Sequence, residues 1–279
     1  MSSSIGRRVD ALQAIVLGIV QGLTEYLPVS STAHLRIVPA FAGWEDPGAA
    51  FTAVVQLGTM AAVLLYFRHD LWRIARTWLA SLRKPELRSE LDARMGWYII
   101  LGTIPIGIFG LVFSSQIESG ARSLYVIGTM LILLGLALLW AEKVGRRDRD
   151  LATINRRDGL LIGLAQACAL VPGVSRSGAT ITAGLFLGFD RESAARYSFL
   201  LSVPAVVLSG AFEMRHIGDH DGAGLGPTLL ATLLAFIVGY GSIAFLLRWL
   251  AHHSTAIFVA YRVVLGALVL ALAGAGVIS

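Results

Sequence analysis

Six long apolar stretches dominate this chain and limit what it can fold into. They occupy residues 50–67, 97–113, 123–141, 195–213, 227–250 and 255–277. A helix needs about 20 mostly apolar residues to cross the hydrocarbon core of a bilayer. Only 15% of the 279 residues are charged, which is few for a soluble domain of this length. The pattern therefore predicts an all-α polytopic membrane protein.

The basic residues give the predicted spans a direction. They gather mainly in two segments, 68–94 and 143–157. Lys and Arg accumulate in cytoplasmic loops, so we expect both segments to be loops that face the cytoplasm and anionic lipid. The segment 214–226 then lies outside, and Arg7 and Arg8 fit poorly because they also land outside. The basic residues behind the net charge of +5 lie mainly in these two segments, so the charge does not indicate a nucleic-acid partner.

Each half of the chain begins with an apolar segment that is interrupted near its middle. Residues 11–42 are broken at Pro28, and residues 159–188 are broken at Pro172 and Gly173. Each part is too short for a comfortable span, so each pair of parts predicts a re-entrant helical hairpin. Ordinary proline-kinked spans are the alternative, and they preserve the same topology.

Each half then contains one hairpin and three spans. Because three is odd, the second half enters the membrane inverted. We predict a first repeat over 1–150 and a second, inverted repeat over 151–279, which form one membrane domain with six transmembrane helices and two re-entrant hairpins. The sequence repeats itself accordingly, since "GIVQG…LPVSSTA" resembles "GLAQA…VPGVSRSG". In folds of this kind the broken helices meet near the midplane and form the site.

The first break carries a group of polar side chains, namely Gln21, Glu25, Ser30, Ser31, Thr32 and His34. If a helix starts near Ser30, Ser31 and His34 lie on one face. A serine beside a histidine, with a carboxylate nearby, is typical of an activated nucleophile, in which the imidazole takes the hydroxyl proton. The choice among the three hydroxyls stays open, and direct attack by water is a further alternative.

The second break carries Ser175, Arg176, Ser177 and Thr180 after its proline and glycine. A helix that starts near Ser175 presents free N–H groups and the positive end of its dipole, which suits an anion. The planar guanidinium of Arg176 adds paired donors that match a phosphate group. The second break therefore predicts an anion cradle.

Structural roles alone are the alternative for each of these groups. The hydroxyls are common helix caps, His34 can link two helices, and Glu25 and Arg176 can neutralise each other. Ionisable groups inside membrane segments are functional by default, however, and three occur at two breaks that are expected to meet. We predict no role in the site for Arg36, His69, Asp190, Arg191, Glu192, His216, His220, His252 and His253, and the single cysteine, Cys168, excludes an internal disulfide.

Two motifs resemble those of a known family. They are "QGLTEYLPVSSTAH", Gln21 to His34, and "PGVSRSGAT", Pro172 to Thr180. The chain is similar over its whole length to the undecaprenyl-pyrophosphate phosphatases, also called bacitracin-resistance proteins. The resemblance implies a plasma-membrane hydrolase that opens to the outer face and removes the terminal phosphate of undecaprenyl pyrophosphate. It also implies recycling of the lipid carrier for cell-wall synthesis, bacitracin resistance and support by a divalent cation such as Mg²⁺ or Ca²⁺.

The resemblance also implies residue roles. Ser31 would be the nucleophile, His34 the base and then the acid, and Arg176 the pyrophosphate clamp. Glu25 would orient His34 or hold the cation, whereas Gln21 is the uncharged option at its position, which weakens the case for a metal ligand there. The residues expected around the substrate are Gln21, Ser30, Thr32, Gly173, Ser175, Ser177 and Thr180.

Two other classes of protein fit parts of the pattern. A secondary transporter or lipid flippase would use the same inverted repeat, with Glu25 and His34 as proton carriers and Arg176 as the anion site. A packing protein would use the polar groups only to satisfy its backbone. The expected partners are undecaprenyl pyrophosphate and membrane lipid, a homodimer is left open, and residues 1–10 show no cleavable signal pattern.

Overall fold

The computed structural model describes residues 9–113, 123–213 and 224–278. Within these ranges the chain is helical, and the only strand-like pairing is an isolated bridge between Arg149 and Phe189. The fold class is therefore all-α, as predicted. Arg7, Arg8, His216, His220 and most of the predicted outer loop lie outside the described residues.

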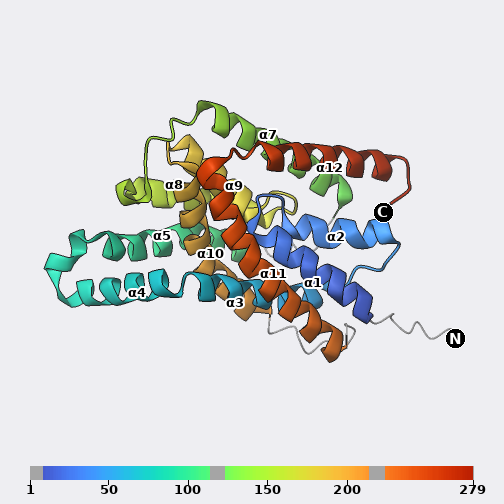
Figure 1. The fold of residues 1–279 in the computed structure, drawn as a ribbon, viewed down its shortest axis with the longest axis horizontal. Helices are drawn as coiled ribbons and strands as arrows, with labels where there is room; N and C mark the ends of the chain where they lie inside the picture. The colour runs from blue at the N-terminus through green and yellow to red at the C-terminus, as the bar shows by residue number, and fades with distance from the viewer. Residues whose placement is uncertain (1–8, 114–122, 214–223, 279) are drawn as a thin grey trace.

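The first half contains two short helices followed by longer ones (Figure 1). The elements are α1 (Ala11–Tyr26), α2 (Ser31–Ala42), α3 (Gly48–Tyr66), α4 (Arg68–Arg83), the 3-10 helix η1 (Pro85–Ser89), α5 (Leu91–Val112) and α7 (Leu124–Val144). Residues 27–30, which join α1 to α2, are called the first tip. The predicted break at Pro28 lies in this tip and is confirmed.

The second half also contains two short helices around a break, followed by longer helices. It contains η2 (Leu151–Thr153), α8 (Arg156–Ala167), η3 (Cys168–Leu170), α9 (Arg176–Phe186), α10 (Arg191–Glu213), α11 (Leu225–His252) and α12 (Ala256–Gly274). Residues 171–175, which precede α9, are called the second tip. The predicted break at Pro172 and Gly173 lies in this tip and is confirmed.

Four helices, α5, α7, α11 and α12, are long and apolar enough to cross a membrane, which makes the chain a multi-pass membrane protein. A fifth candidate consists of residues 51–66 and 68–83 together, bent by 72° at Phe67. The predicted span 195–213 lies in α10, and the side chains of residues 209–213 lie outside the described set. The prediction of six spans is thus matched in part.

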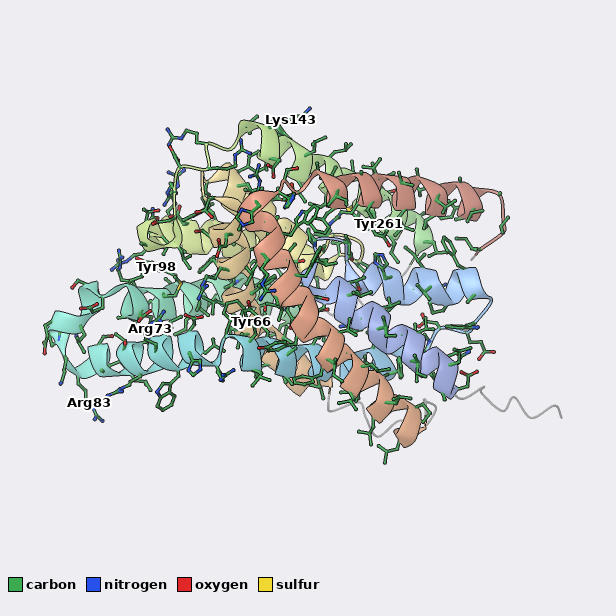
Figure 2. The ribbon with its side chains drawn as sticks, viewed as in Figure 1. Tyr66, Arg73, Arg83, Tyr98, Lys143 and Tyr261 are labelled. Carbon is green, nitrogen blue, oxygen red and sulfur yellow. The ribbon has the colours of Figure 1, made fainter. Side chains whose placement is uncertain are left out.

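The basic segment 68–94 was predicted as a loop, and that prediction is wrong. It forms α4, which lies beside the first part of α5 at one end of the molecule (Figures 1 and 2). The cause is an apolar stripe that binds α4 to α5, in which Trp78 packs so closely on Gly96 that a Cβ there would lie 2.7 Å from the indole. Basic side chains such as Arg73 occupy the exposed surface.

Two helix pairs bring the tips into the middle of the fold. α1 packs along α11, and α8 packs along α5. Both contacts depend on glycine, since a Cβ at Gly18 would lie 2.5 Å from the carbonyl oxygen of Ala231, and one at Gly163 would lie 2.4 Å from Gly102. Small residues allow membrane helices to approach in this way. The two helices that lead into the tips are therefore held at short range by the long helices.

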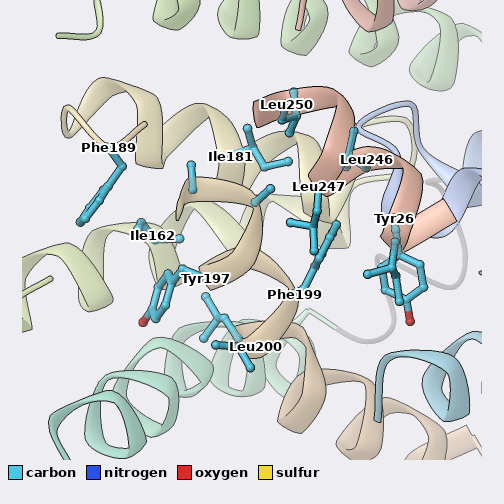
Figure 3. Close-up of a cluster of buried hydrophobic side chains, with 14 of the residues drawn as sticks. Tyr26, Ile162, Ile181, Phe189, Tyr197, Phe199, Leu200, Leu246, Leu247 and Leu250 are labelled. Carbon is cyan, nitrogen blue, oxygen red and sulfur yellow. The ribbon is translucent and has the colours of Figure 1, made fainter. Parts of the chain in front are cut away.

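The largest apolar cluster surrounds α10 and anchors the first tip (Figure 3). Tyr26, the last residue of α1, packs edge-on against Phe199 with ring centroids 5.3 Å apart. Its hydroxyl donates to the carbonyl oxygen of Thr59 in α3. The end of α1 is thus fixed to two other helices, at the residue that directly follows Glu25.

Candidate active site

The same backbone conformation occurs at both tips. Ser30 and Ser175 have positive φ angles of 76° and 70°, which are unusual for residues other than glycine. Each serine caps the following helix, since the hydroxyl of Ser30 accepts from the N–H of Ala33 and that of Ser175 from the N–H of Gly178. The capping alternative is therefore confirmed for these two hydroxyls. Such backbone strain costs about 1–3 kcal/mol per residue and persists where the surroundings enforce it.

The two tips meet, as the sequence predicts. Arg176 donates to Oε1 of Glu25 at 2.6 Å, although the residues lie 151 positions apart. The hydroxyl of Ser177 donates to the carbonyl oxygen of Leu27 at 3.0 Å. The Arg176 side chain is 14% exposed and that of Glu25 is 7% exposed, so the ion pair is almost buried.

Glu25 is the centre of the polar contacts at this junction. Its Oε2 atom accepts from the hydroxyl of Ser31 at 2.7 Å and from the amide of Gln21 at 3.0 Å. Together with Arg176, three donors satisfy the carboxylate, as a buried charge requires. The Oε1 atom of Gln21 is buried and has no hydrogen-bond partner among the described residues.

His34 faces a different set of partners from those predicted. Its Nδ1 lies 2.7 Å from the carbonyl oxygen of Ser30, and its Nε2 lies 2.6 Å from the hydroxyl of Tyr261. A carbonyl only accepts, so Nδ1 carries the hydrogen, and in the neutral imidazole Nε2 accepts from the tyrosine. Within the described residues His34 makes no hydrogen bond to Ser31, which binds Glu25 instead.

The reason is the cap at the start of α2. The imidazole of His34 folds back onto the carbonyl of the strained residue Ser30, one turn earlier. Ser31, the first residue of the helix, reaches across the tip toward α1. A spacing of three residues places both side chains on one face, but it does not make them partners.

The remaining predicted residues lie around this centre. Ser30 and Thr32 are 3.2 Å apart through their hydroxyls, and Ser175 and Ser177 are also 3.2 Å apart. Thr180 is fully buried, and its hydroxyl lies 2.6 Å from that of Ser198 in α10, behind the start of α9.

Gly173 has a φ of 92°, which suits glycine, and a Cβ there would meet α7 at 2.7 Å. Its carbonyl oxygen accepts from Arg262, so this residue contributes to the shape of the second tip and to its attachment.

Sequence reasoning missed two residues of α12. Tyr261 lies between α12 and α2 (Figure 2), where it meets His34. Arg262 is fully buried and donates to backbone carbonyls in both tips. A signal was present, because an arginine stands inside the apolar stretch 255–277, and ionisable residues in such stretches are functional by default.

A second polar network lies where the C-terminal end of α7 meets the N-terminal ends of α10 and α12. Glu142 accepts from Arg147 at 2.9 Å, from Arg191 at 2.7 Å and from the hydroxyl of Thr255 at 2.8 Å. Nearby, Arg149 pairs with Asp158 at 2.6 Å, and this hydrogen bond raises the pKa of the Arg149 guanidinium. These contacts join loops to helices and involve none of the tip residues.

A family model described as bacitracin resistance protein BacA matches residues 14–268, a range that contains both tips and α12. The chain belongs to this family. A relative from Nocardioides sp. named undecaprenyl-diphosphatase is 57% identical over 97% of this chain and 99% of its own length. Relatives of the same name from Thermobifida fusca and Mycolicibacterium smegmatis are each 53% identical over 96% of this chain, covering 92% and 98% of their own lengths.

The donors at the tips can be tested against the divalent cation that the resemblance implies. The described residues contain no group of three or more His, Cys, Asp or Glu side chains that could hold a metal ion. Glu25 supplies a carboxylate, and the unpartnered Oε1 of Gln21 supplies a second oxygen beside it. Mg²⁺ often binds through one or two carboxylates and the phosphates of a substrate. Both oxygens of Glu25 already accept hydrogen bonds, so the described residues supply at most one carboxylate and one amide oxygen, and a phosphate ligand would have to supply further oxygens to a cation.

Proposed function

We propose that this BacA-family chain hydrolyses undecaprenyl pyrophosphate to undecaprenyl phosphate and inorganic phosphate. The observation that carries the proposal is the continuous hydrogen-bonded path from Ser31 through Glu25 to Arg176. It places a hydroxyl nucleophile, a carboxylate that can take its proton and a guanidinium that can bind phosphate within one junction. Relatives named for this activity, with 57% and 53% identity, support the same conclusion.

Substrate binding would rearrange the contacts of Arg176. In the structure its guanidinium is neutralised by Glu25. The terminal phosphate would compete for that guanidinium and for the N-terminus of α9, which is a favourable place for an anion. The hydroxyls of Ser175 and Ser177 lie at the same helix start and would add further donors. The prenyl chain would remain in the lipid.

The reaction would then proceed in two steps. The Oγ atom of Ser31 attacks the terminal phosphorus, its proton passes to Glu25, and the bond from that phosphorus to the bridging oxygen breaks, which releases undecaprenyl phosphate. Water then attacks the phosphorus of the phosphoserine, and the bond from phosphorus to Oγ breaks. The Oγ atom takes back the proton held by Glu25, and inorganic phosphate leaves with the oxygen and both hydrogens of the water. Positioning and charge stabilisation are the main requirements of phosphoryl transfer.

His34 and the cation have supporting places in this proposal. The sequence assigns the base to His34, whereas the hydrogen bond of Ser31 favours Glu25. His34 would serve as a second proton-transfer group, through the Nε2 atom that now meets Tyr261. A divalent cation bound by Glu25 and Gln21 would neutralise charge on the phosphate oxygens.

We also propose the inverted-repeat architecture for this chain, with repeats over 1–150 and 151–279. Matching contacts support it, because the packing of α1 on α11 corresponds to that of α8 on α5. The packing of α3 on α11 likewise corresponds to that of α10 on α5. The six spans would be α3, α5, α7, α10, α11 and α12, and each tip would belong to a re-entrant hairpin.

With the basic segments inside, the proposed location is the bacterial plasma membrane, with the site open to the outer side. Recycling of the lipid carrier and bacitracin resistance would follow from the activity.

The test is phosphate release from undecaprenyl pyrophosphate by the purified protein in detergent, with Mg²⁺ or with EDTA. We expect release by the native protein and a loss of about 10⁴-fold in Ser31→Ala, as for removal of a nucleophile. Ser202→Ala is the matched control, because Ser202 is a buried serine whose hydroxyl only bonds within α10. A residual rate near the native value in Ser31→Ala would support direct attack by water.

The transport alternative predicts a different outcome of the same assay. Detergent solution has no membrane gradient, so a transporter or flippase without hydrolytic activity would release no phosphate. An absence of release from folded native protein, at every cation concentration, would therefore contradict the phosphatase proposal. None of the relatives reported above has a name that indicates transport.

A further inference from the structure

Arg262 is a fully buried arginine whose hydrogen-bond partners are all backbone carbonyls. Its Nε atom donates to Leu131 at 3.1 Å, and its Nη1 atom donates to Pro28 at 3.0 Å. Its Nη2 atom lies 3.0 Å from the carbonyl oxygens of both Gly173 and Val174 and 3.3 Å from that of Met130. No carboxylate pairs with it in the described parts of the chain.

A buried guanidinium without a carboxylate is costly, because its charge has left water without an opposite charge in exchange. The carbonyl groups of the tips are acceptors that lack donors. The helical hydrogen-bond ladder stops at each tip, and unpaired backbone groups inside a membrane protein are also costly. Arg262 meets both needs at once, since its donors satisfy carbonyls that the broken helices leave free.

The positions of these carbonyls make the arrangement a clamp. Pro28 belongs to the first tip, whereas Gly173 and Val174 belong to the second. The guanidinium is a rigid planar fork, so it fixes the separation and the orientation of the groups that it binds. It lies directly against α9, because a Cβ at Gly178 would be 2.8 Å from its Nη1 atom.

The clamp also sets the direction of a backbone donor. The described residues contain no cis peptide bonds, and in a trans peptide the C=O and the following N–H point in opposite directions. The carbonyl of Val174 points toward Arg262, so the N–H of Ser175 points away from it. This N–H has no partner among the described residues, and it lies beside the start of α9, where Arg176 begins the helix.

We propose that Arg262 is a positioning residue of the active site. From behind the tips it holds Glu25 and Ser31 in register with Arg176, and it leaves the N–H of Ser175 free to bind a phosphate oxygen. The catalytic part of this inference rests on the proposed phosphatase function, whereas the clamp itself does not. Arg262 acts through the backbone and makes no contact with the reacting atoms.

The experiment compares Arg262→Lys with Arg149→Lys in the full-length protein in detergent. Arg149 is the matched control, since it also binds backbone carbonyls, of Leu187 at 2.9 Å and of Thr153 at 3.1 Å, but contacts neither tip. Lysine keeps the charge and loses the planar fork. The measurements are kcat, KM, the thermal midpoint and the hydrogen exchange of amides in residues 27–34 and 171–179.

We expect Arg262→Lys to lower kcat by about 100-fold, as small misplacements of reacting groups do, with a much smaller change in KM. Amide exchange should become faster at both tips together. Arg149→Lys should lower the thermal midpoint and leave kcat and the exchange of both tips close to native. A purely structural role of Arg262 predicts instead that the two variants lose kcat only in proportion to their loss of stability.

A variant that keeps the arginine covers the case in which Arg262→Lys does not fold. Gly178→Ala would place a methyl group 2.8 Å from the guanidinium and 3.1 Å from Ser175, so the amide exchange of the first tip, which the methyl group does not touch, is the readout of the clamp. Gly107→Ala is its control, because no described atom lies within 4 Å of a Cβ there. We expect faster exchange at both tips and a lower kcat in Gly178→Ala alone. Native exchange and native kcat in the folded variants would overturn the clamp. A native protein that releases no phosphate would contradict only the proposed function, since the exchange measurement still tests the clamp.

Discussion

The two tips have the same backbone but opposite chemistry. When Ser30 is matched to Ser175, both are strained caps with nearly equal φ angles. The next residue is Ser31 in the first tip helix and Arg176 in the second. The first tip thus leads into the proposed nucleophile, Ser31, at the position where the second leads into a cationic side chain, Arg176.

The same residue-by-residue match shows that Glu25 and His34 have apolar counterparts in the second half. The position of Glu25 corresponds to Leu170 in the second half, and that of His34 corresponds to Ala179. The acidic and proton-carrying groups therefore occur once, on the first side. In the proposed function, two facing helix starts form the active site because each start carries a group that the other lacks.

Removal of the positively charged Arg176 side chain is the strongest way to break this complementarity. We expect Arg176→Gln to lower kcat by about 10³-fold, because a charged donor to the phosphate is lost. The variant should also lose about 3–5 kcal/mol of stability, since Glu25 remains buried without its partner. Phosphate release and thermal unfolding measure the two effects. A double variant, Arg176→Gln with Glu25→Gln, should recover stability but not activity.

Removal of the Tyr261 hydroxyl tests the role of His34, which has no histidine at the matching position of the second half. In Tyr261→Phe the Nε2 atom of His34 loses its donor, which is worth about 1 kcal/mol and corresponds to a roughly fivefold fall in kcat. Tyr240→Phe is the control, since Tyr240 packs against Tyr66 and makes no hydrogen bond to the tips within the described residues. Equal rates in the two variants would show that His34 needs no fixed orientation.

The two glutamines give a matched pair across the repeat. Gln21 donates to Glu25, whereas Gln166 is fully buried and neither of its amide atoms has a partner among the described residues. We expect Gln21→Leu to lower kcat, and we expect Gln166→Leu to leave kcat unchanged and to raise the thermal midpoint, because an unsatisfied amide costs about 1–3 kcal/mol. A loss of kcat in Gln166→Leu would mean that the second glutamine also has a role in the reaction.

Replacement of the strained caps, Ser30 and Ser175, should have the smallest effect on stability, and the effect should have the same sign in both tips. Glycine adopts positive φ angles freely and costs only a few tenths of a kcal/mol as a cap. We therefore expect Ser30→Gly and Ser175→Gly each to change stability by about 1 kcal/mol or less, toward a higher thermal midpoint. Opposite signs in thermal unfolding would show that the two tips differ in strain despite their similar angles.

Much of the fold could be predicted because it follows from apolar patterning and from proline and glycine. The breaks at Pro28 and Pro172 interrupt helices for local reasons, and the predicted inverted repeat is the reason to expect them to meet. The helical state of 68–94 was missed because its charges were taken to indicate a loop, whereas one face of α4 is apolar enough to pack on α5.

Within the site, the pairing of Glu25 and Arg176 could be anticipated from charge. The partner of Ser31 could not, because it depends on the rotamers of the first turn of α2. Arg262 was missed for a related reason. Its partners are backbone carbonyl oxygens, which every residue carries, so no pattern of side chains in the sequence indicates the contact.

The place of Arg262 along the chain also has a consequence for synthesis. Both tips leave the ribosome well before residue 262, so their carbonyls enter the bilayer without the guanidinium that will bind them. A nascent chain that stops short of α12 would hold Glu25, Ser31 and Arg176 but would lack the group that brings them into register. If Arg262 has the proposed positioning role, activity would therefore begin only when translation has passed α12.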